Sequence, residues 1–186
     1  MRVIAGKARS LPLRTVPGLH TRPTTDRIKE TLFNMLNPEL SDARFLDLFA
    51  GSGSIGIEAL SRGASEAVFV DDSVACCDVI RQNLLFTHLD GNARVFRCDV
   101  LNAIGRLEAE KEPFDVIFMD PPYASSGVEL VLKRLENCCL AGPDTLIIFE
   151  ETVQFPSEKI VGSGYVILKE KIYKSNKHVW LKKRGS

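Results

Sequence analysis

Short apolar runs alternate with amphipathic segments along the chain from about residue 44 onward. The apolar runs predict strands at 45–49, 67–70, 93–96, 114–119, 146–149, 165–168 and 177–181. Apolar positions at helical spacing predict helices at 28–36, around 57–60, and at 74–86, 101–109 and 128–140. Strands that alternate with helices indicate an α/β fold with a mostly parallel sheet covered on both faces. The last two strands, separated by 174–176, predict an antiparallel hairpin at the edge of this sheet.

The first residues lack a clear period and contain several prolines among basic side chains. This composition predicts a basic N-terminal arm over 1–24, with at most one short hairpin, followed by a single domain over 25–186. Thr25 or Asp26 is placed to cap the first helix. Asn37-Pro38 ends that helix.

Acidic residues fall at the ends of five predicted strands, namely Asp47, Asp71, Asp99, Asp120 and Glu150. Parallel α/β sheets bind their ligands beyond the carboxyl ends of the strands. One acid at such a position means little, but five of them predict a shared crevice at this edge of the sheet.

A glycine-rich loop follows the first strand and leads into a helix. Gly51, Gly53 and Gly56 have the spacing G-x-G-x-x-G, in which the backbone turns tightly and approaches a ligand closely. Asp71 lies twenty residues after Gly51, where a carboxylate can accept hydrogen bonds from both hydroxyls of a ribose. The pattern predicts a cofactor with an adenosine group and leaves NAD open.

Asp47 favours one such cofactor over the other. A carboxylate just before the glycine loop repels a pyrophosphate and attracts an ammonium or sulfonium group. We therefore expect S-adenosylmethionine rather than NAD. Asp99 is placed either to bind the adenine amino group or to cap the helix that follows it.

The segment Asp120-Pro121-Pro122-Tyr123 is the most specific feature of the sequence. The prolines fix the backbone and remove two donors, so a carboxylate and a carbonyl can together accept the hydrogens of one amino group. A base amino group is a poor nucleophile, and these acceptors localise its lone pair and stabilise the charge that develops on nitrogen. Tyr123 is placed to stack on the base. Asp120 either takes the proton after transfer or acts only through its charge.

Charge is distributed unevenly although the total is zero. Residues 1–29 and 169–186 each carry seven basic residues and one acidic residue, a net charge of +6 for each end. Residues 30–168 carry ten basic and twenty-two acidic residues, a net charge of −12. Basic ends on one face would form a surface for phosphates.

Arg9, Arg14, Arg22 and Arg27 are the candidate phosphate contacts, and the target base would have to leave a duplex or come from a loop to enter a crevice. The stretch around Arg22 could equally be a solvated entry to the first helix.

The five cysteines contain no Cys-x-x-Cys spacing, which predicts buried thiols in a reducing cytoplasm. No metal site is expected, and no apolar run has the length of about 20 residues that a membrane helix needs.

Several segments resemble the bacterial 16S ribosomal RNA guanine-N2 methyltransferases of the RsmD type. They are 2–6 (RVIAG), 22–36 (RPTTDRIKETLFNML), 47–53 (DLFAGSG), 56–64 (GIEALSRGA) and 114–123 (FDVIFMDPPY). The resemblance runs from residue 2 to about 150. The Asp-Pro-Pro-Tyr motif alone is shared with other amino-methylating enzymes, and its combination with the Arg-Pro-Thr block is more specific.

This resemblance implies a Rossmann-like class I methyltransferase fold with seven strands, the last of them antiparallel. It implies S-adenosylmethionine as the donor, and small-subunit ribosomal RNA, presented in a ribosomal particle, as the acceptor. We further expect a monomer located in the cytoplasm. The implied cofactor-binding residues are Asp47, Phe49, Gly51, Ser52, Gly53, Gly56, Asp71, Asp72, Asp99 and Asp120. Asp120 to Tyr123 would hold the guanine, and Arg22 and Thr24 would contact RNA.

The sequence departs from the family pattern at two places. Asp71-Asp72-Ser73 stands where a glutamate, followed two positions later by an aspartate, is usual, so that either Asp71 or Asp72 holds the ribose. The final hairpin lacks a glycine near Ser175-Asn176, which puts its turn in doubt.

Three other functions stay open at this point. The first is the same chemistry on adenine N6 of DNA or RNA, or on a glutamine side chain of a protein. The second is an NAD-dependent oxidoreductase, and the third is a non-catalytic RNA-binding protein.

Overall fold

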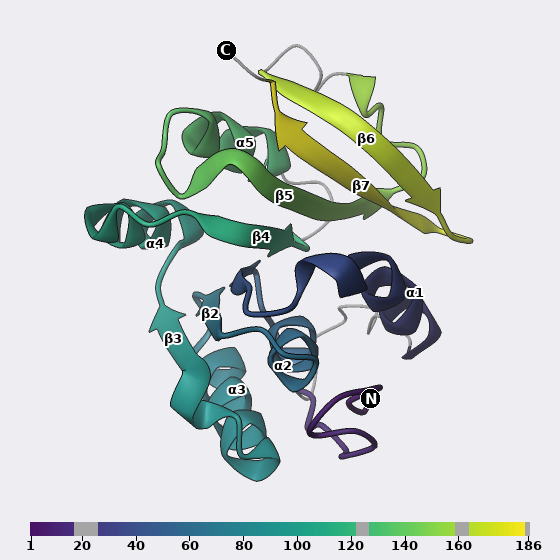
Figure 1. Ribbon diagram of the computed structural model, residues 1–186, viewed down its shortest axis with the longest axis vertical. Helices are drawn as coiled ribbons and strands as arrows, with labels where there is room; N and C mark the ends of the chain where they lie inside the picture. Colours follow the sequence, from purple (N-terminus) through teal and green to yellow (C-terminus); the bar gives the residue numbers. More distant parts are fainter. Residues whose placement is uncertain (17–25, 122–126, 159–163, 185–186) are drawn as a thin grey trace.

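The computed structural model describes residues 1–16, 26–121, 127–158 and 164–184. Its strands form one seven-stranded sheet in the order β3-β2-β1-β4-β5-β7-β6 (Figure 1). The strands are β1 (Arg44–Leu48), β2 (Glu66–Asp71), β3 (Ala93–Arg97), β4 (Phe114–Met119), β5 (Ala141–Thr152), β6 (Tyr165–Ile172) and β7 (Asn176–Lys183). The first five are parallel to one another, and β7 is antiparallel to both β5 and β6. This topology confirms the predicted fold.

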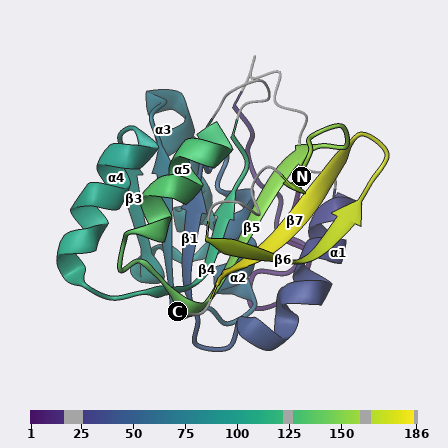
Figure 2. The ribbon, with the colours of Figure 1, turned by 90° about the horizontal axis from the view of Figure 1, so that it is seen from above.

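The described part of the chain also has five α-helices and three short 3₁₀ turns. They are α1 (Asp26–Leu36), η1 (Asn37–Glu39), α2 (Ser54–Ser61), α3 (Val74–Thr87), η2 (Asp90–Asn92), α4 (Val100–Leu107), η3 (Glu108–Glu110) and α5 (Gly127–Glu136), of which α1 and η1 precede the first strand. The β6–β7 hairpin lies at the opposite end of the sheet from β3 (Figures 1 and 2).

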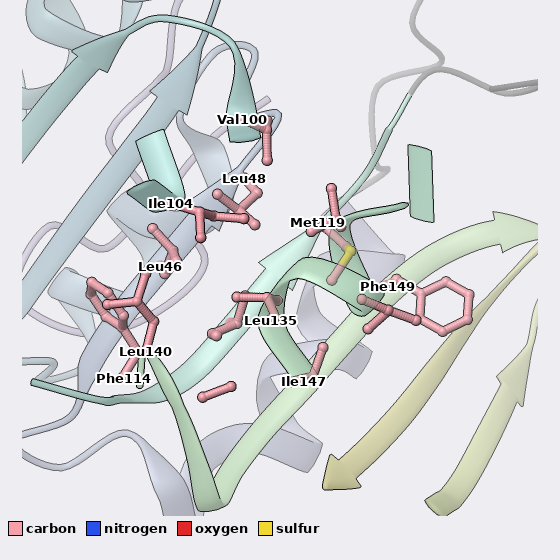
Figure 3. Close-up of a cluster of buried hydrophobic side chains, with 14 of the residues drawn as sticks. Leu46, Leu48, Val100, Ile104, Phe114, Met119, Leu135, Leu140, Ile147 and Phe149 are labelled. Carbon is pink, nitrogen blue, oxygen red and sulfur yellow. The ribbon is translucent and has the colours of Figure 1, made fainter. Parts of the chain in front are cut away.

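The two faces of the sheet have separate hydrophobic cores, because successive side chains of a strand point to opposite faces. One core contains Leu46, Leu48 and Met119 from the sheet with Ile104 of α4 and Leu135 of α5 (Figure 3). On the other face, side chains of α1, α2 and α3 pack on the alternate strand positions, among them Phe45, Phe69, Val116, Phe118, Ile148 and Trp180. Helices therefore cover both faces of the sheet, as expected.

Several element boundaries differ from those that the apolar pattern predicts, among them the start of β5 and the end of α5. Strand β5 begins at Ala141 rather than at Leu146, because an irregularity in its pairing with β4 accommodates Gly142 to Thr145. Thr145 supports this irregularity by donating its hydroxyl to the Phe114 carbonyl at 2.6 Å. Helix α5 ends at Glu136, four residues before the predicted end.

The turn between β6 and β7 forms without a glycine. The Tyr173 backbone N–H donates to the Asn176 carbonyl at 2.8 Å, which closes the hairpin. Lys174 and Ser175 are not among the residues with positive φ, so this turn does not need the conformation that favours glycine.

Residues 1–16 pack against the domain. Arg2 and Pro12 form an antiparallel bridge, which is the short hairpin allowed by the sequence, and Val3, Ala8 and Leu13 are buried in the core beside α2. The segment therefore shares a hydrophobic core with the sheet.

Three of the five cysteines, Cys76, Cys77 and Cys138, are buried free thiols. Cys98 is half-buried and Cys139 is exposed, so the expectation of buried thiols is wrong for Cys139. Among the described residues, no helix is long and apolar enough to cross a membrane.

Candidate active site

The glycine-rich loop leaves β1 and becomes the N-terminus of α2 at the carboxyl edge of the sheet. Gly53 is the residue before α2 and has φ +76°, a conformation that an L side chain rarely adopts. Gly56 lies against the Phe69 ring, and a Cβ on it would come within 2.3 Å of that ring. Gly53 thus allows the turn, and Gly56 allows α2 to pack closely on β2, as the spacing predicted.

Asp47 is buried on β1 beneath this loop, and its side chain is only 2% exposed. One carboxylate oxygen accepts the Gly56 backbone N–H at 2.9 Å. Burial raises the pKa of Asp47 to about 7, the Gly56 hydrogen bond opposes this shift, and the negative charge of Asp71 adds to it. A buried carboxylate with so little compensation is suited to bind a cationic ligand. This chemistry fits the ammonium and sulfonium groups of S-adenosylmethionine.

Asp71 at the end of β2 shapes the same loop. Its two carboxylate oxygens accept the backbone N–H groups of Gly51 at 2.8 Å and of Ser73 at 2.9 Å. Asp72 is exposed and does not share this role. Ser52 is held nearby, because Asn83 of α3 donates its amide to the Ser52 carbonyl at 2.9 Å.

Asp99 follows β3 and caps α4. Its Oδ1 accepts the backbone N–H groups of Leu101 at 2.9 Å and Asn102 at 3.3 Å, so the capping role is present in the structure. Phe49 follows β1 with a positive φ of 62°, and its side chain packs against the core beside α4 and α5.

Asp120 follows β4, the strand next to β1, and brings a second carboxylate to this edge. Its pKa is raised well above the ordinary value, first by burial and then by the negative charges of Glu150, Asp47 and Glu151. Pro121 is buried beside it. The predicted residues Pro122 and Tyr123 lie outside the described residues.

The pairing of the strands explains why these acids meet. Asp47 pairs with Phe118, and Met119 pairs with Phe149, so continuing the register places Asp120 beside Glu150. The sequence identified Glu150 as a strand-end acid but did not include it among the site residues. The nearest sequence signal was its position directly after an apolar strand.

The predicted RNA-binding residues do not all lie together. Arg9 and Arg27 line a pocket of about 390 Å³ with Arg2, and the remaining lining residues are Ile4, Ser10, Asp26 and Glu30. Arg14 lies against α3 instead, where its guanidinium donates to Gln82 at 2.7 Å. Arg22 and Thr24 lie outside the described residues.

Arg2 completes this pocket, although it is not among the predicted phosphate contacts. Its guanidinium pairs with Asp26 at 3.3 Å, and the preceding Met1 Sδ lies 3.7 Å from the Ser52 hydroxyl. The pocket therefore adjoins the segment that reaches the glycine loop. In the described part of the chain, no group of acidic, histidine and cysteine side chains could hold a metal ion.

Comparison with known proteins adds the family to this geometry. Residues 1–182 match the family model described as "Conserved hypothetical protein 95". The chain is 40% identical over 156 residues to "Ribosomal RNA small subunit methyltransferase D" of Escherichia coli strain K12, covering 83% of this chain and 76% of that protein. The chain belongs to the RsmD-type methyltransferase family.

A second relative and a solved structure are similar to the chain over its full length. The "Putative rRNA methyltransferase YlbH" of Bacillus subtilis strain 168 is 36% identical over 185 residues, covering 100% of both chains. The solved structure "Putative methyltransferase yhhF from Escherichia coli" has a TM-score of 0.84 and 33% identity, covering 100% of this chain and 99% of that one. The agreement extends to the N-terminal hairpin and the C-terminal strands, which are parts of the same family fold.

Proposed function

We propose that this protein transfers a methyl group from S-adenosylmethionine to the exocyclic N2 of a guanine in small-subunit ribosomal RNA. Methylation of ribosomal RNA follows from its family, whose members include the relatives named as ribosomal RNA small subunit methyltransferases. The choice of guanine N2 rests on the resemblance of its motifs and on the acceptor chemistry at Asp120.

The proposal depends above all on the meeting of Asp47 and Asp120 at the ends of two adjacent strands. One carboxylate lies beneath the glycine loop and is suited to a cationic donor. The other lies at the start of the Asp-Pro-Pro-Tyr motif and is suited to an amino group with two hydrogens to donate. Two such sites side by side are what a direct transfer from donor to nitrogen requires.

The residues that would hold the cofactor are Asp47, Phe49, Gly51, Ser52, Gly53, Gly56, Asp71, Asp72, Asp99 and Asp120. When bound, S-adenosylmethionine supplies an electrophilic methyl group. Asp120 accepts a hydrogen bond from the target amino group, which localises the nitrogen lone pair and orients it. As the nitrogen–carbon bond forms, the nitrogen becomes positive and loses a proton. The raised pKa of Asp120 suits it to accept this proton.

The RNA is held, in this proposal, by the pocket that contains Arg2, Arg9 and Arg27. Arginine side chains bind phosphates through paired N–H donors. The position of the pocket beside the hairpin that reaches Ser52 supports a path for RNA from the pocket to the glycine loop. We further predict a monomer that acts on a ribosomal particle in the cytoplasm.

The decisive experiment is transfer of tritiated methyl groups from S-adenosylmethionine to small ribosomal subunits that lack this modification, followed by nucleoside digestion. Label in N2-methylguanosine would support donor, acceptor and atom together. Label in N6-methyladenosine, or in ribosomal protein, would overturn the guanine proposal. Naked ribosomal RNA and matched DNA serve as controls for the state and class of the acceptor.

A second titration separates this proposal from an oxidoreductase on the same sheet. We expect binding of S-adenosylmethionine and no competition by NAD. Tight NAD binding without S-adenosylmethionine binding would reject the methyltransferase proposal.

A further inference from the structure

Glu150 is fixed at the end of β5 by two side chains of the C-terminal hairpin. Its Oε2 accepts from His178 Nε2 at 3.0 Å, and its Oε1 accepts from the Asn176 amide at 2.5 Å. All three residues are buried, with His178 0% exposed. Both carboxylate oxygens therefore have a donor on β7, and Glu150 is held in one orientation.

His178 is itself oriented by its other ring nitrogen. Nδ1 lies 3.2 Å from the Tyr173 hydroxyl. Burial and the charge of Glu150 raise the pKa of Tyr173 to about 12, so its hydroxyl keeps its proton and can donate it to Nδ1. A neutral imidazole that accepts at Nδ1 carries its hydrogen on Nε2, which then points at Glu150. The Tyr173 hydroxyl is therefore compatible with the tautomer in which His178 donates to Glu150.

The imidazole ring also has little freedom to rotate, because aromatic rings surround it. Phe118, Tyr173 and Trp180 contact it edge to face, with centroid distances of 5.9, 5.1 and 5.7 Å. Such packing restricts the ring to the plane that its hydrogen bonds require. The network is consequently rigid as well as connected.

The sheet aligns this network with Asp120. Glu150 and His178 are direct partners in the β5–β7 pairing, and the β4–β5 register continues to Asp120 beside Glu150. Phe118, Ile148 and Trp180 lie two residues before or after these positions on their strands and share the face covered by α1. Asp120, Glu150 and His178 therefore occupy one row of the sheet and point to the same face.

We propose that Tyr173, His178 and Asn176 are positioning residues for methyl transfer. They hold ionised Glu150 beside Asp120. The negative charge of Glu150 keeps the Asp120 carboxylate basic enough to accept the proton from the methylated nitrogen. This inference rests on the proposed transfer to nitrogen. As the carbon–nitrogen bond forms, the methyl–sulfur bond breaks. The N–H electrons then return to nitrogen, and the proton passes to the Asp120 carboxylate.

The charged groups around this row determine how the pKa of Asp120, and with it the pH dependence of methyl transfer, should respond to substitutions. Asp120 faces Glu150 and Glu151 of β5 and Asp47 of β1. Glu150 faces Asp120 on one side and His178, Asn176 and Tyr173 on the other. Lys171 of β6 pairs with His178 across the strands but is exposed, and Lys177 of β7 pairs with Glu170 at 3.0 Å. An ionised Glu150 is thus an immediate source of negative charge for Asp120.

The test measures single-turnover methyl transfer against pH for four variants of the full chain on small ribosomal subunits. Glu150→Gln removes the negative charge, so we expect a transfer rate about tenfold lower, with its acidic limb shifted to lower pH. His178→Leu removes one of the two donors of Glu150 and favours its protonated, neutral form, so the acidic limb also shifts to lower pH. His178→Gln can still donate a hydrogen bond to Glu150 and is expected to restore most of the rate. Tyr173→Phe is expected to lower the rate a few-fold.

Shifts of the acidic limb to lower pH in both Glu150→Gln and His178→Leu, with the profile restored in His178→Gln, would support a positioning role, because loss of folded protein lowers the rate without moving a pH limb. Glu170→Gln is the matched control, a carboxylate-to-amide change on the same hairpin, and should leave rate and pH profile unchanged. The affinity for S-adenosylmethionine should be unaltered in all variants. The inference is wrong if the wild type transfers methyl groups to nitrogen and the acidic limb of the pH profile stays at the wild-type pH in folded Glu150→Gln and His178→Leu. If the wild type does not methylate a nitrogen at all, the proposed function has failed instead.

Discussion

Two regions of this protein bury acidic side chains, and they treat the negative charge in opposite ways. At Glu58, in the middle of α2, the carboxylate is completely buried and surrounded by donors. It pairs with Arg62 at 2.8 Å and Lys29 at 3.4 Å and accepts the backbone N–H groups of Ile4 and Ala5. At the edge of the sheet, Asp47 has a single hydrogen bond from Gly56 within the described chain.

The difference separates a structural charge from one suited to a ligand. Glu58 connects the N-terminal hairpin, α1 and α2, and its partners satisfy it without any ligand. Asp47 and Asp120 lie among other acids, and their raised pKa values indicate that the fold does not compensate their charge. Perturbed carboxylates of this kind concentrate at functional sites, where a cationic ligand can supply the missing compensation.

The largest expected effect is a loss of folding stability at Glu58, the acid whose charge is compensated. Glu58→Gln leaves the Lys29 ammonium buried without its partner charge, and we expect the free energy of unfolding to fall by about 3–5 kcal/mol. Burial already lowers the pKa of Lys29, and Glu58 opposes this shift. Urea denaturation measures the loss. The double variant Lys29→Met, Glu58→Gln should recover part of it, and no recovery would mean that the backbone hydrogen bonds of Glu58 dominate.

At the uncompensated edge, Asp120→Asn is expected to lower methyl transfer by about 10²–10³-fold, because an amide neither accepts the proton nor stabilises the developing positive charge equally well. The fold should be unaffected, since Asn has the same shape. Single-turnover transfer to small subunits measures the effect. A variant with unchanged transfer would remove Asp120 from the mechanism.

Asp47→Asn should affect the cofactor more than the chemical step. Loss of one charged contact weakens S-adenosylmethionine binding by about ten- to a hundredfold, which calorimetry can measure. Equal affinity in the variant and the wild type would mean that Asp47 only supports the loop through Gly56.

Asp47→Asn also tests how the uncompensated charge of Asp47 affects the pH dependence of folding stability. The folded pKa of Asp47 is about 7, above its ordinary value of 3.8, so its protonated form favours folding. This contribution is fully present below the unfolded pKa and is lost as pH rises through 7. In ligand-free protein, Asp47→Asn should therefore lose less stability than the wild type between pH 4 and 8. Parallel stability curves for both proteins would contradict the raised pKa.

The smallest effect is expected at the basic pocket. Each phosphate contact contributes about 0.9 to the dependence of log affinity on log salt for duplexes and about 0.7 for single strands. Arg9→Ala with Arg27→Ala should therefore reduce the salt slope of RNA binding by roughly one to two units. Arg106→Ala, in the last turn of α4, is the control outside the pocket. An equal change in the control would indicate a general effect of charge.

Most of the fold was accessible from the sequence because its signals are local. Strand β4 was predicted over its full range, and β1, β2 and β3 to within a residue at each end, since apolar runs bounded by acids and glycines need no distant partner. The extension of β5 back to Ala141 was missed because Gly142 and the residues after it favour a loop, and only pairing with β4 makes them part of the strand. The missing hairpin glycine proved irrelevant for a similar reason, since β6 and β7 pair along their length.

The same distinction between local sequence signals and tertiary contacts applies to the candidate site. The glycine loop, Asp47 and Asp71 could be predicted, because residue type and spacing within one βαβ unit are enough to place them near one another. Asp120 could be predicted from its position at the carboxyl end of another strand of the parallel sheet. Their protonation states could not, because the pKa of Asp47 is raised by burial beneath α2, and the pKa of Asp120 is raised first by burial and then by the acids of β5 and β1. Of the predicted phosphate contacts, tertiary packing brought Arg9 and Arg27 together with Arg2 and directed Arg14 to α3.

The sequence by itself determined the order of strands and helices, the glycine loop and the row of acids at the strand ends, since each depends on neighbours within about ten residues. Only the tertiary structure decided which buried charges are compensated and which are not. It also placed Asn176 and His178 against Glu150, which lies 26 residues before Asn176 in the chain, and it placed Tyr173 against His178. The physical reason is that burial and charge compensation depend on contacts between distant segments, which form only when the antiparallel hairpin pairs with β5.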